Sequence, residues 1–536
     1  MSKPDWRYHR ERQRARGRGR KQAKPSNARD AIEALLSEGL GRRGFPAALE
    51  VEAGEVASAA ASRPGPRRDL TELPTFTVDP ATARDFDDAV SARREGDSTR
   101  LWVHIADVAA HVRPGSPLDR EASRRANSTY APGTVEPMLP HALSSEACSL
   151  SPGAERLAVT AEIELGPGGE ARRASFYRSR IRSDARLDYD QLDLVFSGRA
   201  EPPESVAEPL AIAREAARAL GERRSATSLD VESFEPEFRF DAKGNPTGAQ
   251  AVAQTESHQL IERLMILTNE QVADLLERKR VPAIFRVHPQ PDPRQVERLV
   301  AQMHDLGIPT PPLRGTVTPQ QAAEVVAEAS RLVMREAARR KHGRAAYTSL
   351  VLRSLKQAQY SERNSGHAGL GSPAYCHFTS PIRRYPDLVV HRALLAVLGE
   401  GESAPSAAEV RDAALHCSEQ ERESMKMERK ADDICAAFLL ERELRERGEE
   451  AEFEGEVSGV IRAGAFVGFG GKLGDVYEGF LPARRLGVER FELNEVETAL
   501  VGAESGRKLR LGDPVSVRVD GVEAARGRAD LAPAKA

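Results

Sequence analysis

Four aspartates crowd into the ten residues from Asp79 to Asp88, within the stretch TVDPATARDFDDA. They follow a strand-like run at Thr75–Val78, so they occupy a predicted strand end and the loop after it. Carboxylates this close together repel one another unless cations lie among them. Ligand sets made only of oxygen favour Mg²⁺ or Mn²⁺ over zinc. The cluster therefore indicates a divalent-metal site, with a solvated acidic loop as the alternative.

The spacing of these aspartates suits two metal ions. Asp85 and Asp87 are two residues apart, so in an extended chain they project to the same side, and Asp79 and Asp88 close the cage from neighbouring turns. Two divalent ions about 3.5–4 Å apart can activate a water molecule and stabilise the leaving oxygen in phosphodiester cleavage. A calcium loop is a weaker alternative, because the glycine and the distal glutamate of the EF-hand pattern are missing.

Composition excludes a membrane protein and a disulfide-stabilised one. The chain has 536 residues, 40% of them hydrophobic and 30% charged, which allows two or three globular domains. No apolar run approaches the roughly 18 residues that a membrane span needs, and the basic N-terminus lacks the apolar core of a secretory signal. We therefore expect a cytoplasmic protein with no membrane partner. The four cysteines are far apart and form no CxxC pair, so we expect buried, reduced thiols.

Periodicity and charge divide the chain into five parts. Residues 1–27 are predicted to be a basic disordered tail, because residues 1–25 hold ten Lys or Arg and only two acids. Residues 28–68 show a short helical pattern and a linker, residues 69–398 mix strands with helices, and residues 399–448 form a helical segment with dense alternating charge. From 449 to 533 the pattern changes to short strands with glycine turns, which is typical of a five-stranded OB-type barrel.

The aspartate stretch resembles the opening motif of the ribonuclease II/ribonuclease R (RNB) family. Further matches follow in family order, namely HIADV from His104, RANSTYAPGTVEPMLPHALSSEACSLSPGAERL from Arg125, RLDYDQL from Arg186, LIERLMILTN from Leu260, FRVHPQPDP from Phe285 and HFTSPIRRYPDLVVHR from His377. This resemblance implies an α+β fold, in which a mixed sheet surrounded by helices encloses an RNA channel and an OB-type barrel follows. It also implies a 3′→5′ exoribonuclease that hydrolyses single-stranded RNA to nucleoside 5′-monophosphates in RNA decay or processing.

The resemblance assigns catalytic roles to particular residues. It implies that Asp79, Asp85, Asp87 and Asp88 bind Mg²⁺, with Mn²⁺ as the alternative ion, and Asp87 is expected to be the most essential because it lies at the centre of the cluster. Arg383 becomes the catalytic arginine, whose guanidinium offsets charge that develops in the transition state. Arg384 contacts the substrate backbone or carries structure. Without the family match, this arginine pair would be interpreted as part of a surface ion pair.

Single-stranded RNA is gripped by aromatic faces on which its bases stack, each worth about 1–3 kcal/mol. By resemblance, Tyr130 packs near the last nucleotide and Tyr189 clamps upstream bases. Glu262 and Glu428 match family glutamates near the terminal nucleotide and the channel, although a glutamate on a helix flank is commonplace. In the barrel, the candidates for base stacking are Phe466, Phe469 and Tyr477, of which one or two are expected to fill the core instead. His104, Asp107 and His111 are interpreted as fold residues rather than metal ligands.

The sequence also departs from the family pattern. Arg263 stands where the family has a second glutamate, and Ala368 replaces a phenylalanine in a GHFGL motif. Fewer than 70 residues precede the catalytic segment, so we expect a short form without paired N-terminal cold-shock barrels. One alternative is a catalytically inactive RNA-binding regulator that retains the fold, and another is a nuclease acting on DNA. The expected partner is single-stranded RNA; the sequence names no protein partner and is compatible with a monomer.

Overall fold

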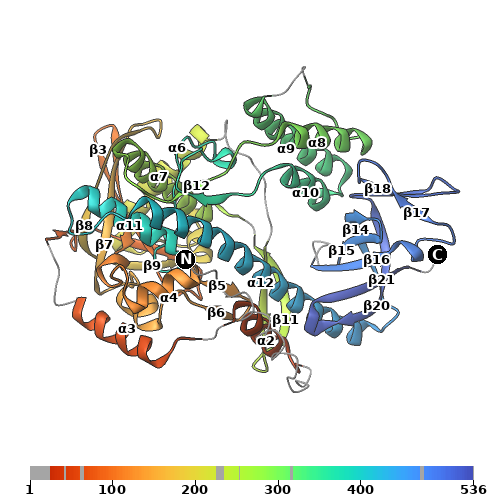
Figure 1. Cartoon of the computed structure of the whole chain (residues 1–536), viewed down its shortest axis with the longest axis horizontal. Coiled ribbons are helices and arrows are strands. Elements are labelled where there is room, and N and C mark those ends of the chain that lie inside the picture. Colours follow the sequence, from red (N-terminus) through yellow and green to blue (C-terminus); the bar gives the residue numbers. More distant parts are fainter. Residues whose placement is uncertain are drawn as a thin grey trace, which may run out of the picture.

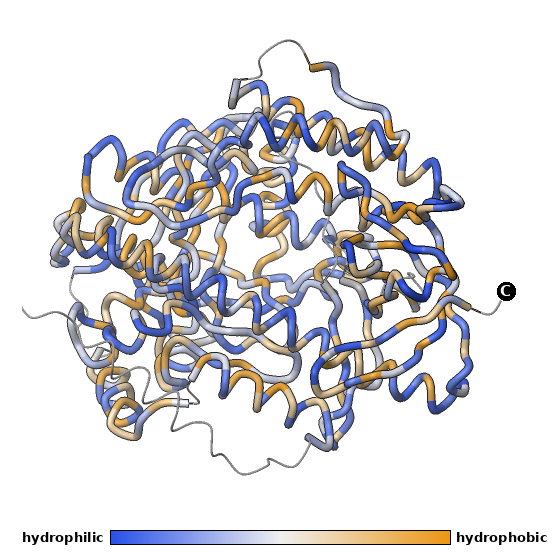
Figure 2. Tube along the Cα trace, turned by 45° about the vertical axis from the view of Figure 1, so that its right-hand side comes forward, coloured by the Kyte–Doolittle hydropathy of each residue, from blue (hydrophilic) through white to orange (hydrophobic). Residues whose placement is uncertain are grey.

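The computed structural model describes residues 25–41, 44–60, 66–224, 235–252, 254–313, 318–470 and 476–534. Most of the basic tail expected at residues 1–27 lies outside them. Figure 1 shows an α/β part and a β-barrel joined by one long helix, α12 (Ala407–Arg447), which runs from the first to the second. Along most helices and strands, hydrophilic and hydrophobic residues alternate over short intervals (Figure 2), as expected where one side faces a core and the other faces water.

The α/β part is built on a seven-stranded mixed sheet with the strand order β1-β8-β7-β4-β3-β2-β9. The strands are β1 (Arg68–Asp69), β2 (Phe76–Asp79), β3 (Asp88–Glu95), β4 (Ser98–Ala106), β7 (Glu155–Leu165), β8 (Ala171–Arg182) and β9 (Ala185–Asp188). Most neighbouring strands are antiparallel, but β2 pairs with β9 and β1 pairs with β8 in parallel. This order places the end of β2, the start of β3 and the end of β9 at one region of the sheet.

Helices pack around the sheet because their apolar stripes have to be buried. In α7 (Glu256–Lys279) the predicted stripe is buried through Leu260, Ile261, Leu264, Met265 and Val272. Strand β9 leads directly into α5 (Tyr189–Phe196), which Asp188 begins by a capping box with Gln191. The remaining elements of this part are α2 (Ala28–Leu40), α3 (Ala47–Ala60), α4 (Pro117–Arg125), β5 (Thr129–Ala131), β6 (Thr134–Glu136), α6 (Ala207–Arg224), β10 (Glu235–Phe240), β11 (Pro246–Val252), β12 (Phe285–Val287), β13 (Gln359–Ser361) and α11 (Tyr385–Leu398).

Three further helices form a separate small core beside the barrel. They are α8 (Pro293–Asp305), α9 (Pro319–Arg340) and α10 (Arg344–Ser354), and they pack around Val296, Leu299, Met303, Val333 and Tyr347. This unit also reaches the C-terminal part, where the Asp305 carboxylate accepts a hydrogen bond from Asn494 Nδ2 at 3.1 Å. The barrel is thus held by the three-helix unit as well as by α12.

The C-terminal part is a closed five-stranded barrel, as the sequence predicted. Its strands are β14 (Glu452–Ile461), β15 (Gly464–Phe469), β16 (Tyr477–Pro482), β20 (Pro514–Glu523) and β21 (Arg528–Pro533). The sequence did not predict the additional three-stranded sheet between β16 and β20, formed by β17 (Phe491–Leu493), β18 (Ala499–Gly502) and β19 (Lys508–Arg510). With the mixed sheet and its helices, the barrel confirms the expected α+β fold.

Three expectations about the chain's chemistry can be compared with the structure directly. All four cysteines are buried and free, as expected. Among the described helices, none combines the length and the apolar character that crossing a membrane requires. Asp107 lies in an ion pair with Arg67 at 2.7 Å and with Arg178 at 2.9 Å, so it serves the fold, as expected.

The buried imidazole of His104 makes the stability of this fold dependent on pH. Its Nδ1 lies 2.8 Å from Thr160 Oγ1 and its Nε2 lies 3.2 Å from Ser91 Oγ, and burial lowers the pKa of His104 from 6.5 to about 3. Between these values the folded chain binds fewer protons than the unfolded chain. The contribution of His104 to the free energy of unfolding is therefore fully present above pH 6.5 and is lost as the pH falls toward 3.

We expect His104 to cost about 1.4 kcal/mol of unfolding free energy for each pH unit below roughly 6. Urea unfolding measured from pH 7 down to pH 5 would report this slope, to which other buried histidines also contribute. The variant His104→Gln keeps a polar side chain and does not titrate, so its slope should be shallower than that of the parent. Equal slopes in both proteins would contradict the assignment.

Candidate active site

The four aspartates gather where β2 ends and β3 begins. Asp79 is the last residue of β2, Asp88 is the first residue of β3, and Asp85 and Asp87 lie in the loop between them. Because β2 and β3 are neighbours in the sheet, the two ends of this loop lie close together. Burial, together with the negative charges of Asp88, Asp87 and Asp85, raises the pKa of Asp79 to about 8. The fold therefore brings the predicted carboxylates within electrostatic reach of one another.

Asp87 is the most deeply held of the four, with only 3% of its surface exposed. Its Oδ1 accepts a hydrogen bond from the Ile382 N–H at 2.8 Å, and its Oδ2 lies 3.4 Å from Arg383 Nε. Burial raises the pKa of Asp87 well above its usual range, although the positive charge of Arg383 opposes the shift. Burial also raises the pKa of Asp88 to about 6. These groups are costly to ionise without further cations.

Two carboxylate oxygens in this cluster lack a hydrogen-bond partner. Oδ2 of Asp79 and Oδ2 of Asp87 are both buried, and neither accepts a hydrogen bond. A buried charge without a sufficient partner costs several kcal/mol, and a divalent cation would supply both the missing contact and the opposite charge. Because every side chain in the set offers oxygen, the residues fit Mg²⁺ or Mn²⁺.

The closed cage expected from the four side chains is nevertheless not formed. The Tyr130 hydroxyl donates a hydrogen bond to Asp85 Oδ2 at 2.9 Å, while Asp87 is held by Ile382 and Arg383. Within the described residues, no three His, Cys, Asp or Glu side chains meet in an arrangement that could hold a metal ion. Partners from distant elements determine where these carboxylates lie, and the local spacing of the sequence could not reveal them.

The two adjacent arginines have different environments. The Arg383 side chain is 44% exposed, and besides approaching Asp87 its Nη2 donates a hydrogen bond to Ser380 Oγ at 3.0 Å. The Arg384 side chain is 21% exposed and forms an ion pair with the fully buried Asp387 at 2.8 Å. The same Asp387 oxygen accepts a hydrogen bond from the Ser380 N–H at 2.8 Å. Arg384 therefore fixes the loop before α11, whereas Arg383 extends toward the aspartates and the solvent.

A cavity of about 230 Å³ lies beside Arg383. Tyr130, Arg384 and Tyr360 line it from the α/β part, and Glu421 and Glu428 line it from α12. The Tyr130 N–H donates a hydrogen bond to Glu428 Oε1 at 2.8 Å, although the two residues are 298 positions apart. The structure thus brings Tyr130, Arg383 and Glu428 to one cavity, where Tyr130 contacts Asp85 and Arg383 contacts Asp87.

Tyr189 approaches the aspartates from the start of α5. Its pKa is raised by burial and then by the charges of Asp88 and Asp79. Its ring stacks on the imidazole of His258, with 4.0 Å between centroids and 11° between planes. Sequence reasoning missed His258, although it precedes Glu262 by four residues and so lies on the same face of α7. Glu262 is exposed and accepts a hydrogen bond from Gln254 Nε2 at 2.7 Å.

The departure at Arg263 serves helix packing. Its Nη1 donates to the Ala217 carbonyl at 3.2 Å and its Nη2 donates to Gln259 Oε1 at 2.8 Å, which joins α7 to α6. A side chain at Gly221 would collide with the Arg263 guanidinium, so the glycine makes room for it. Nothing in the structure explains the replacement at Ala368.

Only one of the three barrel aromatics is available to a base. Phe469 is fully buried, and Tyr477 is 4% exposed with its hydroxyl donating to Glu443 Oε2 at 2.7 Å. Both belong to the barrel core, and Tyr477 also connects the barrel to α12. Phe466 is half-buried beside Phe480, with 5.4 Å between the ring centroids. The expectation that Tyr477 stacks on RNA is therefore wrong, because its ring is used inside the fold.

Comparisons with known proteins agree with this arrangement. The model of the RNB domain matches residues 67–400, and that of the S1 RNA binding domain matches residues 446–532. Ribonuclease R of Escherichia coli is 34% identical over 475 residues, covering 85% of this chain and 56% of the relative. Ribonuclease R of Aquifex aeolicus is 35% identical over 472 residues, covering 87% of this chain and 64% of the relative.

A solved structure shows the same architecture. Mycoplasma genitalium RNase R in complex with ribose methylated single-stranded RNA matches with a TM-score of 0.83 and 26% identity, covering 95% of this chain and 78% of that chain. The chain spans between half and two thirds of the length of the two curated relatives. The likeness therefore extends over nearly all of this chain but over only part of those proteins.

Proposed function

The chain belongs to the RNB-domain family, and from this premise we propose that it is an exoribonuclease that shortens single-stranded RNA from its 3′ end. It hydrolyses the last phosphodiester bond and releases nucleoside 5′-monophosphates. The observation that carries the proposal is the pair of buried carboxylate oxygens on Asp79 and Asp87 that accept no hydrogen bond, with Arg383 as the cation beside Asp87. A protein that only binds RNA has no use for carboxylates that repel phosphate, whereas a metal-dependent hydrolase needs them.

Each residue of the site has a role in this reaction. Asp79, Asp85, Asp87 and Asp88 would hold divalent ions, Mg²⁺ or alternatively Mn²⁺, which supply an activated water and neutralise charge on the leaving oxygen. Asp87 orients Arg383 through their 3.4 Å ion pair, so that the remaining N–H groups of the guanidinium face the phosphodiester. Arg383 then stabilises the negative charge that develops on the phosphate in the transition state.

Aromatic rings position the RNA. Tyr130 and Tyr189 offer faces for the terminal and the upstream bases, and Glu428 fixes the backbone at Tyr130. Glu262 contacts the terminal nucleotide from the same helix face as His258. The barrel, with Phe466 on its outer surface, binds the RNA strand without strong sequence preference, since stacking accepts any base.

The proposal is tested with single-stranded RNA of about 30 nucleotides, labelled at either end and incubated with Mg²⁺, Mn²⁺ or a chelator. We expect the 5′-labelled RNA to shorten stepwise and the 3′-labelled RNA to release labelled mononucleotide at once, with no reaction in the chelator. A 2′-deoxy segment near the 3′ end should stall the reaction if ribose is recognised. Tight RNA binding without shortening at any metal concentration would support the inactive regulator instead.

Removing the His258 ring should weaken RNA binding more than it slows the hydrolysis step. A stacked pair contributes about 0.5–1.5 kcal/mol, so His258→Ala should raise KM for RNA by roughly two- to tenfold and leave kcat nearly unchanged. The variant His258→Phe keeps a stacking ring under Tyr189 and should restore the parent KM. Steady-state kinetics on the same RNA would check both values. Equal KM values for the alanine and phenylalanine variants would refute the role of the stack.

A further inference from the structure

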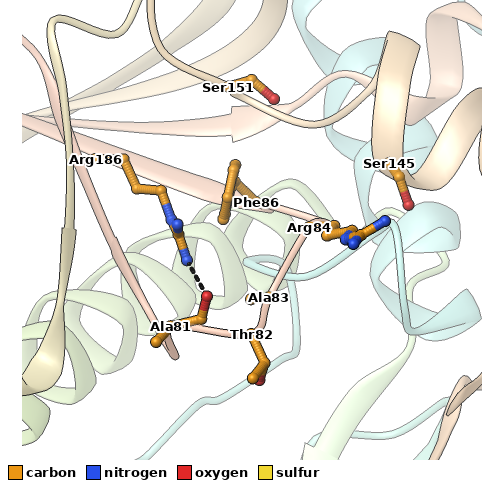
Figure 3. A pocket seen from close by; sticks show the side chains of 8 residues that line it. All are labelled: Ala81, Thr82, Ala83, Arg84, Phe86, Ser145, Ser151 and Arg186. Carbon is orange, nitrogen blue, oxygen red and sulfur yellow. Dashed lines mark hydrogen bonds between the residues drawn. The ribbon is translucent and has the colours of Figure 1, made fainter. Parts of the chain in front are cut away.

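A second cavity, of about 560 Å³, is bounded by the same loop that carries Asp85. Figure 3 shows its lining, which consists of Ala81, Thr82, Ala83, Arg84 and Phe86 from the loop, Ser145, Ser151 and Arg186. None of the four aspartates lines it, and neither does any other acidic residue. The same loop therefore carries two separate sets of side chains. Its aspartates contact other parts of the fold, and its remaining residues line this cavity.

The lining combines two guanidinium groups with three hydroxyl groups. Arg186 Nη2 donates hydrogen bonds to the carbonyls of Pro80 at 3.1 Å and Ala81 at 2.7 Å, so its guanidinium is fixed at the wall, as Figure 3 shows for Ala81. Arg84 is exposed, and no ion pair joins it to a carboxylate in the described part of the chain. The hydroxyls are those of Thr82, Ser145 and Ser151. This lining favours an anion with several oxygen atoms.

The loop that forms the cavity is firmly held. Ser149 Oγ accepts a hydrogen bond from the Phe86 N–H at 3.0 Å and donates one to the Arg84 carbonyl at 2.9 Å. The Arg186 guanidinium lies 5.1 Å from the centroid of the Phe86 ring, and the ring is almost completely buried. The backbone on both sides of Arg84 is therefore anchored, and the cavity is a preformed feature of the fold.

We propose that this cavity binds a nucleoside 5′-monophosphate, with the phosphate at Arg84 and Arg186. The inference rests on the proposed function, because this ligand is the product of the proposed reaction. An anion released beside buried carboxylates is repelled by them. Along the same loop it meets Arg84, which no ion pair joins to a carboxylate in the described part of the chain, and Arg186, whose charge also acts on Asp79. A volume of about 560 Å³ lies within the range of small-molecule sites, about 300–1,000 Å³, and leaves room for the nucleoside as well as the phosphate.

Calorimetric titration of the full chain with adenosine 5′-monophosphate, in chelator and without RNA, tests the proposal. We expect the parent to bind this nucleotide, Arg84→Ala to bind it about tenfold more weakly, as for a lost hydrogen bond to a charged group, and Arg84→Glu not to bind it measurably. Arg113 is exposed and lines neither cavity, so Arg113→Ala is the matched control and should bind like the parent. Adenosine and inorganic phosphate should each bind more weakly than the nucleotide.

Three outcomes would overturn the inference. They are no binding by the parent, equal binding by the parent and Arg84→Ala, and binding of inorganic phosphate as tight as that of the nucleotide. Displacement of the bound nucleotide by a short RNA would place it in the RNA-binding site instead and would also refute the proposal. Failure of the proposed function would be seen separately, as absence of RNA shortening. If the nucleotide still bound in an Arg84-dependent way in that case, the cavity would be a nucleotide site, but the nucleotide would not be a reaction product.

Discussion

Asp87→Asn should lower the rate of RNA shortening by about 10³-fold or more, the loss expected when a metal site gives up several kcal/mol of transition-state stabilisation. The amide oxygen of asparagine can still accept the hydrogen bond from the Ile382 N–H, which is 2.8 Å long in the parent, so the loop should keep its shape. The substitution removes the charge that faces Arg383 and would hold the metal. Single-turnover rates on 5′-labelled RNA, together with RNA binding in chelator, would separate lost chemistry from lost binding.

The same variant should unfold at a higher temperature than the parent when metal is absent. Asp87 is buried, its Oδ2 lacks a hydrogen bond, and a neutral amide avoids the cost of holding a charge there. A gain of about 1 kcal/mol would raise Tm by roughly 1 °C for a chain of this length. Asp97→Asn, in the exposed turn between β3 and β4, is the matched control and should change neither rate nor Tm. Parent-like RNA shortening by Asp87→Asn would remove the basis of the proposed mechanism.

Arg383→Ala should lower kcat by about 10²–10³-fold, as when one preorganised donor to a developing charge is lost. The Arg383 side chain is 44% exposed and lies 3.4 Å from Asp87, so its removal should lower the free energy of unfolding only through the lost ion pair, and by less than the loss expected for Arg384→Ala. Arg383→Lys keeps the charge without the planar guanidinium and should recover only part of the rate. Initial rates at saturating RNA, compared with urea unfolding, would measure both effects.

The neighbouring Arg384 provides the contrast. Arg384→Ala leaves Asp387 buried without its ion-pair partner, and breaking a buried pair costs about 3–5 kcal/mol. We therefore expect this variant to lose stability, with activity falling as a consequence of the disturbed loop. If Arg383→Ala lost as much stability as Arg384→Ala, or kept the parent kcat, the assignment of the catalytic arginine would be wrong.

The sequence by itself determined the kind of chemistry and the sequence of elements. Four carboxylates within ten residues of sequence stay close together in any fold, and because like charges repel, they indicate bound cations. The stripe along α7 and the change to short strands after residue 449 are local periodicities, and burial enforces them directly. The resemblance to the RNB family rested on motifs in their order, which needs no coordinates.

Only the tertiary structure decided how each side chain is used. It showed that Arg384 is tied to Asp387 while Arg383 faces Asp87, and that Tyr477 is buried within the barrel. It also placed Glu428 against Tyr130 across 298 residues of sequence. The physical reason is that burial, hydrogen bonding and charge pairing depend on which distant elements pack together. Periodicity reports only the face that a residue occupies on its own helix or strand.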